Sequence, residues 1–318
     1  MISTRFGAAS TADDVVAGLD LSGIRAVVTG ASSGIGVETA RSLARCGAEI
    51  TLAVRDTAAG HRTADDITRA TGNRRLHVSA LDLTDRRSVT AFGHRWTGPL
   101  HLLINNAGVF TPGLRRTVEG WEWQFATHHL GHFALSLGLH DALAAGARDR
   151  GESRIVALTS GAHMNSPVVF DDLHFDRRDY DPQAAYGQAK TANVLFAVEA
   201  SRRWAADGIV ANAVNPGGVA TGLQRDFTSE QRDYLAAAES AGVFTYKTTQ
   251  QGAATTLVAA VAPEFAGTGG HYLDDGNEAC TVDDDATLFE HSHAVKRWAL
   301  DPEAARRLWR VSRDHLDR

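Results

Sequence analysis

The sequence predicts an α/β fold built on one doubly wound parallel sheet of about seven strands, with helices on both faces. Two observations predict this fold. Short apolar runs alternate along the chain with longer stretches of helical pattern, as expected of a parallel sheet with crossover helices. The apolar runs are also unbroken rather than alternating, as in strands that are covered on both faces. With 43% hydrophobic residues over 318 positions, the chain can bury the large core that such a fold needs.

The elements are expected in the following order. Residues 1–22 are interpreted as an N-terminal extension in which Thr11 caps a short helix. Residues 23–318 are interpreted as a single catalytic domain, because no low-complexity or proline-rich linker divides them. Strands are predicted at 26–28, 50–54, 76–78, 100–104, 155–158, 210–214 and 271–273. Helices are predicted near 34–46, 57–71, 85–96, 117–146, 182–206 and 249–262.

Two late segments lie outside this alternation. Residues 222–248 lack a strand pattern, and a long insertion late in an α/β fold predicts a lid over a site, with a surface helix pair as the alternative. The lid carries four aromatic residues, Phe227, Tyr234, Phe244 and Tyr246. Residues 285–318 are predicted as a helical tail, because Asp301 can cap a helix that has Pro302 at its first position. Three apolar residues are expected to dock this helix onto the body: Leu308, Trp309 and Val311.

Composition and charge disfavour several classes of protein. The formal net charge of −6 argues against nucleic acid or an anionic membrane as the main partner. We expect no membrane association, because no apolar run is long enough for a span and the N-terminus has no signal-peptide core. Cys46 and Cys280 are far apart, which favours a reducing cytoplasm. No cysteine cluster or paired-histidine motif is present, so no metal site is predicted.

A glycine-rich turn follows the first predicted strand and precedes a helix, in the run Thr29-Gly30-Ala31-Ser32-Ser33-Gly34-Ile35-Gly36. Glycines let the chain turn tightly and bring backbone amides close to phosphates at a helix N-terminus. The position after the first strand favours a cofactor site over a tight turn with nothing bound. The predicted cofactor contacts are Gly30, Ser32, Ser33, Gly34, Ile35 and Gly36. Residues 23–318 are therefore interpreted as a dinucleotide-binding domain of the Rossmann type.

The ends of the next strands indicate which cofactor is used. The second strand ends in Val54-Arg55-Asp56, where Arg55 could pair with a 2′-phosphate and Val54 cannot bind a ribose hydroxyl. This favours NADP(H), while Asp56 leaves NAD(H) possible; a solvated Arg55, with Asp56 capping the next helix, is the alternative. Two residues after the third strand could hold the adenine, Asp82 and Leu83. Small residues after the fourth strand permit close approach of a ligand: Asn106, Ala107 and Gly108.

A tyrosine and a lysine carry the predicted chemistry. Tyr186 and Lys190 are four positions apart in a helix predicted to start at Asp181-Pro182, so they share a face. A lysine cation beside the phenol is expected to lower the pKa of Tyr186, so that the phenol can pass a proton near neutral pH. The alternative is that Tyr186 and Lys190 lie side by side on a solvated helix face. Ser160 argues against this alternative, because it lies at the end of the fifth predicted strand, where ligands bind in such sheets.

Taken together, these motifs resemble the short-chain dehydrogenase/reductase family over about residues 23–275. The matching elements are Thr29–Gly36, Asp82, Asn105–Gly108, Ser160, Tyr186 with Lys190, and Pro216-Gly217 with Thr221. Within the family the chain is most similar to the retinol-dehydrogenase-like branch. The branch resemblance rests on Ala53–Asp56, His129–Phe133 and Lys190–Phe196.

The resemblance implies a role for each matching residue. Tyr186 would be the general acid/base, Lys190 would bind the nicotinamide ribose, and Ser160 would hydrogen-bond the substrate oxygen. Four residues would line the nicotinamide end of the cofactor: Pro216, Gly217, Val219 and Thr221. The resemblance also implies a homodimer or homotetramer that pairs through the helices at 117–146 and 182–206.

One residue departs from the family pattern. His128 stands where the family has an asparagine that helps hold a water for proton relay to the lysine. Three alternatives remain: a tolerated substitution with slower turnover, participation of His128 in the relay because imidazole titrates near neutral pH, or loss of redox activity. His128 is therefore counted with Ser160, Tyr186 and Lys190 among the candidate catalytic residues.

The function predicted from these residues is hydride transfer between NADP(H) and a carbonyl/secondary alcohol pair, with a small and fairly apolar substrate. Two alternatives belong to other classes. One is a nucleotide-binding regulator with little or no turnover, which His128 favours and the intact Ser160, Tyr186 and Lys190 disfavour. The other is an epimerase or lyase that uses the cofactor transiently.

Overall fold

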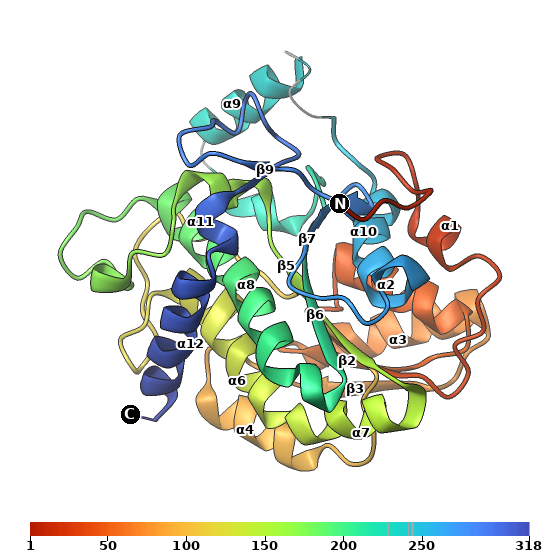
Figure 1. Cartoon of the computed structure of the whole chain (residues 1–318). Coiled ribbons are helices and arrows are strands. Elements are labelled where there is room, and N and C mark those ends of the chain that lie inside the picture. The colour runs from red at the N-terminus through yellow and green to blue at the C-terminus, as the bar shows by residue number, and fades with distance from the viewer. Residues whose placement is uncertain (228, 241, 243–244, 318) are drawn as a thin grey trace.

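The computed structural model describes residues 1–227, 229–240, 242 and 245–317 (Figure 1). Its centre is an eight-stranded sheet in the order β3-β2-β1-β4-β5-β6-β7-β8. The strands are β1 Arg25–Thr29, β2 Glu49–Val54, β3 Leu76–Ala80, β4 Leu102–Asn105, β5 Ser153–Leu158, β6 Ile209–Asn215, β7 Tyr272–Asp274 and β8 Asn277–Glu278. All neighbouring pairs are parallel except β7 with β8, so the predicted doubly wound parallel sheet is confirmed.

Strand β8 adds to the seven predicted strands. Asp275 and Gly276, with φ of 47° and 76°, reverse the chain after β7, so that β8 pairs antiparallel with it. Left-handed backbone at both central positions is what a two-residue Asp-Gly hairpin turn requires.

Helices cover both faces of the sheet (Figure 1). On one face lie α2 (Ile35–Arg45), α3 (Thr57–Thr71) and α10 (Thr249–Val261). On the other lie α4 (Arg86–Arg95), α6 (Gly131–Gly138), α7 (His140–Arg150) and α8 (Pro182–Trp204). Neighbouring residues of β1 show the division, because Val28 packs into the first core and Val27 into the second. Because successive side chains of a strand point to opposite faces, a strand that is buried on both faces has consecutive apolar residues in its sequence.

The region predicted as one helix at 117–146 begins later and is divided. Glu122 caps the short helix α5 (Trp123–Phe125) by accepting hydrogen bonds from the amides of Gln124 and Phe125, at 2.9 and 2.7 Å. A π-helical turn, Ala126–Leu130, follows before α6 and contains His128. Such turns are rare and occur mostly at functional sites.

The N-terminal segment 1–22 is tied to the body of the protein. Thr11 caps α1 (Ala12–Val16) through a capping box, as expected, and α1 packs against α10. Before α1, the backbone amide of Ile2 donates a hydrogen bond to Glu278 of β8 at 2.7 Å. Both ends of the segment therefore contact elements that are far away in the sequence.

The C-terminal region contains β9 (Thr281–Val282), β10 (Val295–Lys296), α11 (Arg297–Leu300) and α12 (Pro302–Leu316). The helical tail predicted from residue 285 therefore begins only at Arg297, because a loop and β10 precede it. Asp301 caps α12, as expected. The Trp309 ring stacks on Phe196 of α8 with centroids 6.2 Å apart and meets Trp204 edge-on at 5.2 Å, which confirms the predicted docking. Figure 1 shows α12, in dark blue, alongside α8. A partner subunit could therefore reach this side of α8, one of the expected pairing helices, only if α12 moved away.

The segment predicted as a lid contains a 3-10 turn, Gly222–Asp226, and helix α9 (Ser229–Ser240). Phe244 and the side chain of Tyr234 lie outside the described residues. Across the described ranges, no helix is long and apolar enough to cross a membrane.

Candidate active site

The predicted site residues meet at one edge of the sheet. Gly30 follows β1, Asn106 follows β4, Ser160 follows β5 and Gly217 follows β6. These four strands are neighbours and parallel, so their carboxyl ends lie at the same edge. Ligands of open α/β sheets bind at this edge.

The glycine turn is shaped by contacts that only glycine permits. Gly30 has a φ of 66°, and a Cβ atom there would lie 2.8 Å from Cα of Ala107. A Cβ atom on Gly36 would lie 2.5 Å from Nδ2 of Asn106. The backbone of the turn is thus held against the end of β4, and α2 begins at Ile35 with its N-terminus at this edge. This arrangement fits a phosphate cradle.

The two ends of the predicted cofactor site touch each other. A Cβ atom on Gly34, whose φ is 62°, would lie 3.4 Å from Cγ2 of Thr221. Val219 is buried and pairs with Lys247 in an isolated parallel bridge. The structure therefore brings the segment after β6 to the glycine turn, although more than 180 residues separate Gly34 from Thr221.

Thr29 organises this edge and was not among the predicted contacts. Its Oγ1 accepts hydrogen bonds from the amides of Asn106 and Ala107, both at 2.9 Å. It also lies 2.8 Å from Nε2 of His132, whose Nδ1 lies 2.9 Å from the carbonyl oxygen of His128. Nδ1–H donates to that carbonyl, and burial lowers the pKa of His132 to about 4, so the ring is neutral. Its Nε2 therefore accepts from the Thr29 hydroxyl, which also lies 3.3 Å from the carbonyl oxygen of Ile104.

The residues after β2 and β3 are engaged in different ways. Asp56 caps α3 by accepting from the amide of Ala59 at 3.0 Å. Arg55 is exposed, and no hydrogen bond or ion pair of its guanidinium is found among the described residues. Asp82 accepts hydrogen bonds from the amide and hydroxyl of Thr84 at 2.9 and 2.7 Å, so one of its carboxylate oxygens stabilises the turn that follows β3. Leu83 is buried.

The three catalytic candidates come together from β5 and α8. Asp181 caps α8 and Pro182 is its first residue, as expected, which places Tyr186 and Lys190 on successive turns. Nζ of Lys190 donates to the carbonyl oxygen of Leu158 at 3.1 Å and lies 5.4 Å from the centroid of the Tyr186 ring. Ser160 reaches the same place, because its hydroxyl interacts with the Tyr186 phenol.

The expected lowering of the Tyr186 pKa is wrong for the protein alone. Burial raises the pKa of Tyr186 to about 12, and the hydrogen bond with Ser160 opposes this only in part. Burial also lowers the pKa of Lys190 to about 7. Both shifts have one cause, because the charged form of each group loses hydration. At neutral pH the phenol therefore keeps its proton, as a proton donor must.

His128 is fully buried beside Tyr186. The two rings meet edge to face, with centroids 5.3 Å apart. Nε2 of His128 lies 2.7 Å from the carbonyl oxygen of Val109 and 3.1 Å from its amide nitrogen, and the shorter contact assigns the proton to Nε2. Nδ1 then carries a buried lone pair for which the described residues offer no partner.

The ionisation of His128 differs from the expectation behind the relay hypothesis. Burial, reinforced by the Lys190 charge, lowers the pKa of His128 well below its ordinary value. The ring therefore does not titrate near neutral pH, which corrects that part of the hypothesis. A Cβ atom on Gly108 would lie 2.9 Å from Cε1 of His128, so the predicted glycine is needed to admit the ring.

Phe110 is a site residue that the sequence analysis missed. Its buried ring lies 5.9 Å from that of Tyr186 and 4.7 Å from that of Phe227, between centroids. Phe227 was noted as an aromatic residue of the lid, and Phe110 connects it to the catalytic tyrosine candidate. The available signal was position, because Phe110 follows Asn106–Gly108 at the carboxyl end of β4.

Comparisons with known proteins extend these observations. The family model described as short chain dehydrogenase matches residues 25–232. A Streptomyces lividans protein named "Probable oxidoreductase" is 48% identical over 303 residues, which cover 94% of this chain and 99% of that protein. Retinol dehydrogenase 12 of Mus musculus is 36% identical over 90% of this chain and 84% of its own length. A solved structure of an uncharacterized Mycobacterium paratuberculosis protein matches with a TM-score of 0.71 and 30% identity, over 99% of this chain and 98% of that chain.

Proposed function

The chain belongs to the short-chain dehydrogenase/reductase family, in its retinol-dehydrogenase-like branch, and from that premise we propose that it is an NADP-preferring oxidoreductase of a carbonyl and its secondary alcohol. The observation that carries the proposal is the convergence of Ser160, Tyr186 and Lys190 at the sheet edge that also holds the glycine turn. An acid, its stabilising cation and a hydroxyl donor are the groups that carbonyl reduction needs beside a hydride source.

The residues at the sheet edge fit a nicotinamide dinucleotide. When bound, the cofactor would supply the hydride that is exchanged with the carbonyl carbon. The glycine turn and the N-terminus of α2 would hold its phosphates. Pro216, Gly217, Val219 and Thr221 would line the nicotinamide end, and the approach of Thr221 to Gly34 supports one continuous site. Asp82 and Leu83 would hold the adenine, and the small residues at Asn106–Gly108 would let the cofactor approach the backbone closely.

Arg55 supports a preference for NADP(H). Its guanidinium is exposed and has no partner within the described ranges, so it is available to a 2′-phosphate. The neighbouring carboxylate of Asp56 is engaged as the cap of α3, which leaves it less available to a ribose hydroxyl.

Tyr186 would give its proton to the carbonyl oxygen during reduction, while Ser160 hydrogen-bonds the same oxygen. The raised pKa of Tyr186 supports the donor role, because the phenol stays protonated until hydride arrival makes that oxygen strongly basic. Lys190, held near the Tyr186 ring by the Leu158 carbonyl, would stabilise the phenolate that remains.

The surroundings of Tyr186 support a small and fairly apolar substrate. Phe110 lies against the Tyr186 ring, and Phe227 of the lid lies against Phe110. A carbonyl oxygen placed between Ser160 and Tyr186 would leave the rest of the substrate beside these aromatic surfaces, which favour apolar groups.

The proposal is tested with purified protein, NADPH or NADH, and a panel of aliphatic and aromatic ketones, followed by cofactor absorbance. Tyr186→Phe should lower kcat by about a thousandfold while NADPH binding is retained. Arg55→Ala should raise the KM for NADPH about tenfold and leave that for NADH unchanged. Arg62→Ala, an exposed arginine of α3, is the matched control and should change neither.

Two results would replace the proposal with an alternative from another class. NADPH binding with no turnover on any ketone would indicate a nucleotide-binding regulator, which the unusual His128 favours. Product formation with no net change in cofactor would indicate an epimerase or lyase.

A further inference from the structure

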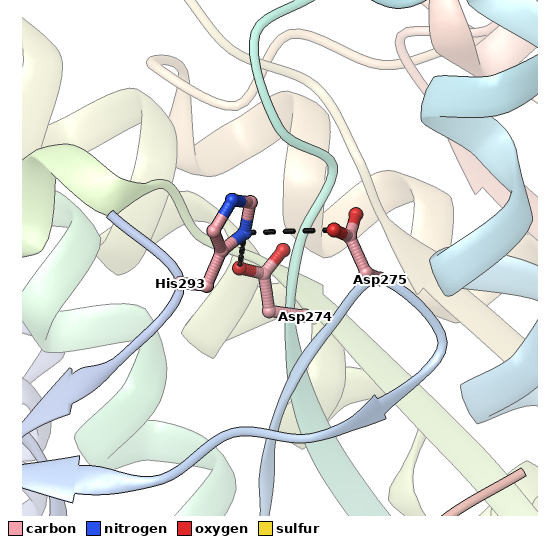
Figure 2. A group of neighbouring side chains, drawn as sticks. All are labelled: Asp274, Asp275 and His293. Atoms are coloured by element: carbon pink, nitrogen blue, oxygen red, sulfur yellow. Dashed lines mark hydrogen bonds and ion pairs between the residues drawn. The ribbon is translucent and has the colours of Figure 1, made fainter. Parts of the chain in front are cut away.

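Asp274, Asp275 and His293 form a charged cluster (Figure 2). None of the three is among the predicted functional residues. The cluster is close to the candidate active site, because Nζ of Lys247, which pairs with Asp275, would lie 2.9 Å from a Cβ atom on Gly217. Nδ1 of His293 lies 2.7 Å from a carboxylate oxygen of Asp274 and 3.5 Å from one of Asp275. The Lys247 ammonium pairs with the other oxygen of Asp275. The hydrogen bond that His293 donates to the Asp274 carboxylate raises the pKa of His293, which favours the imidazolium. Two carboxylates then face two cations, so the charges balance as an ion-pair network.

This network joins three segments that are distant in sequence. Asp274 ends β7 and Asp275 begins the turn to β8. The amide of Lys247 donates to the carbonyl oxygen of Gly218 at 2.8 Å, next to the predicted nicotinamide contacts. His293 belongs to the loop at 283–294 between β9 and β10, which we call the C-terminal loop. The His293–Asp274 pair therefore fastens the C-terminal loop to the carboxyl end of the sheet.

The C-terminal loop crosses the segment that begins with Ser160. A Cβ atom on Gly161 would lie 3.1 Å from Cδ1 of Leu288 and 3.7 Å from the carbonyl oxygen of Ser292. Gly161 thus leaves room for a half-buried leucine directly beside the serine candidate. Leu288 is the apolar side chain through which the loop contacts this position.

A histidine connects the end of the loop to Ser160 itself. The amide of Lys296 donates to Nε2 of His163 at 3.2 Å, and Nδ1 of His163 lies 2.9 Å from the carbonyl oxygen of Ser160. Nε2 must accept, so Nδ1–H donates to Ser160, and the ring is neutral. Burial lowers the pKa of His163 to about 4, in agreement with this assignment. The loop is thus fixed at one end through His163 and near that end through His293.

We propose that the C-terminal loop forms a wall of the substrate pocket, in which Leu288 limits the size of the group that fits beside Ser160 and His293 is the positioning residue that holds the wall through Asp274. The inference rests on the proposed function, because it assigns specificity to the same site. Phe110 and Phe227 bound the Tyr186 side of that site, and Leu288 bounds the Ser160 side.

The size test compares ketones that differ only in the length or branching of one alkyl group. Leu288→Ala should raise kcat/KM for the bulkiest ketone relative to the smallest by about tenfold, and Leu288→Trp should lower that ratio by a similar factor. Phe289→Ala removes an exposed neighbour in the same loop, 56% accessible to solvent, and should leave the ratio unchanged. An unchanged ratio in both Leu288 variants would overturn the proposal that the C-terminal loop forms a wall of the substrate pocket.

The positioning role of His293 has a readout that needs no turnover. His293→Asn should increase hydrogen–deuterium exchange of amides within 283–294, and raise KM for ketones with little change in kcat. Exchange identical to that of the wild type would overturn the positioning role. Failure of the proposed function looks different, since the wild type would then reduce no ketone at all.

Discussion

Acidification from about pH 7 to about pH 5 should destabilise this fold steeply, because burial lowers the pKa of five histidines and keeps their rings neutral. They are His128, His129, His132, His163 and His174. Burial lowers the pKa of His129 to about 3 and those of His132, His163 and His174 to about 4, while that of His128 lies well below its ordinary value. The unfolded chain therefore binds more protons than the folded one at pH values between the folded and unfolded pKa.

The expected loss follows from that difference. Each histidine contributes its full stability above the unfolded pKa of about 6.5, and the contribution falls by about 1.4 kcal/mol per pH unit as the pH decreases toward the folded value. At about pH 5 this amounts to about 2 kcal/mol for each histidine with a folded pKa of about 3 or 4, or about 8 kcal/mol for these four, and His128 acts in the same direction. Total stabilities of native proteins are only about 5–15 kcal/mol, so the protein should be close to unfolding there.

The assay is urea unfolding followed by circular dichroism across this pH range. Near pH 5.5 the slope of the unfolding free energy against pH should correspond to an uptake of about four protons. His129→Asn should reduce the uptake by about one proton. The exposed His61→Asn is the control and should leave it unchanged. An uptake below about one proton in the wild type would refute the reasoning, because the histidines would then not be held neutral.

The remaining predictions concern single contacts. Gly30→Ala should abolish NADPH binding in titrations, because its Cβ atom would lie 2.8 Å from Ala107. Thr29→Val should lower the free energy of unfolding in urea by about 2 kcal/mol and raise the KM for NADPH, because two amides lose their acceptor. Thr29→Ser keeps the hydroxyl and should restore both values. Trp309→Ala should lower the free energy of unfolding by about 3–5 kcal/mol in the same assay. His128→Asn should leave the pH dependence of kcat unchanged, because the buried ring does not titrate near neutrality; a shifted profile would restore the relay hypothesis.

Much of the fold was predictable because its signals are local. The two-sided burial of β1 produces an unbroken apolar run, and Asp181-Pro182 marks the start of α8 and hence the placement of Tyr186 and Lys190. The Asp275-Gly276 pair was an equally local signal for the β7–β8 hairpin and was missed.

The parts that could not be predicted depend on burial and on distant contacts. Spacing alone suggested that Lys190 lowers the pKa of Tyr186, but the actual direction is set by loss of hydration, which requires knowing what covers both groups. The contact of Leu288 with Gly161 joins positions more than 120 residues apart, and no pattern near either residue indicates it. The same holds for the hydrogen bond between Lys296 and His163.

The covering of α8 by α12 has a consequence for how the chain is made. Helix α12 leaves the ribosome after α8, and it carries Trp309, which packs on Phe196 and Trp204. Until α12 has been translated, the Phe196 and Trp204 rings lack the cover of Trp309, although all the strands of the central sheet have already been translated. A chain terminated before residue 302 would expose them permanently and should be recognised by chaperones and proteases as incomplete.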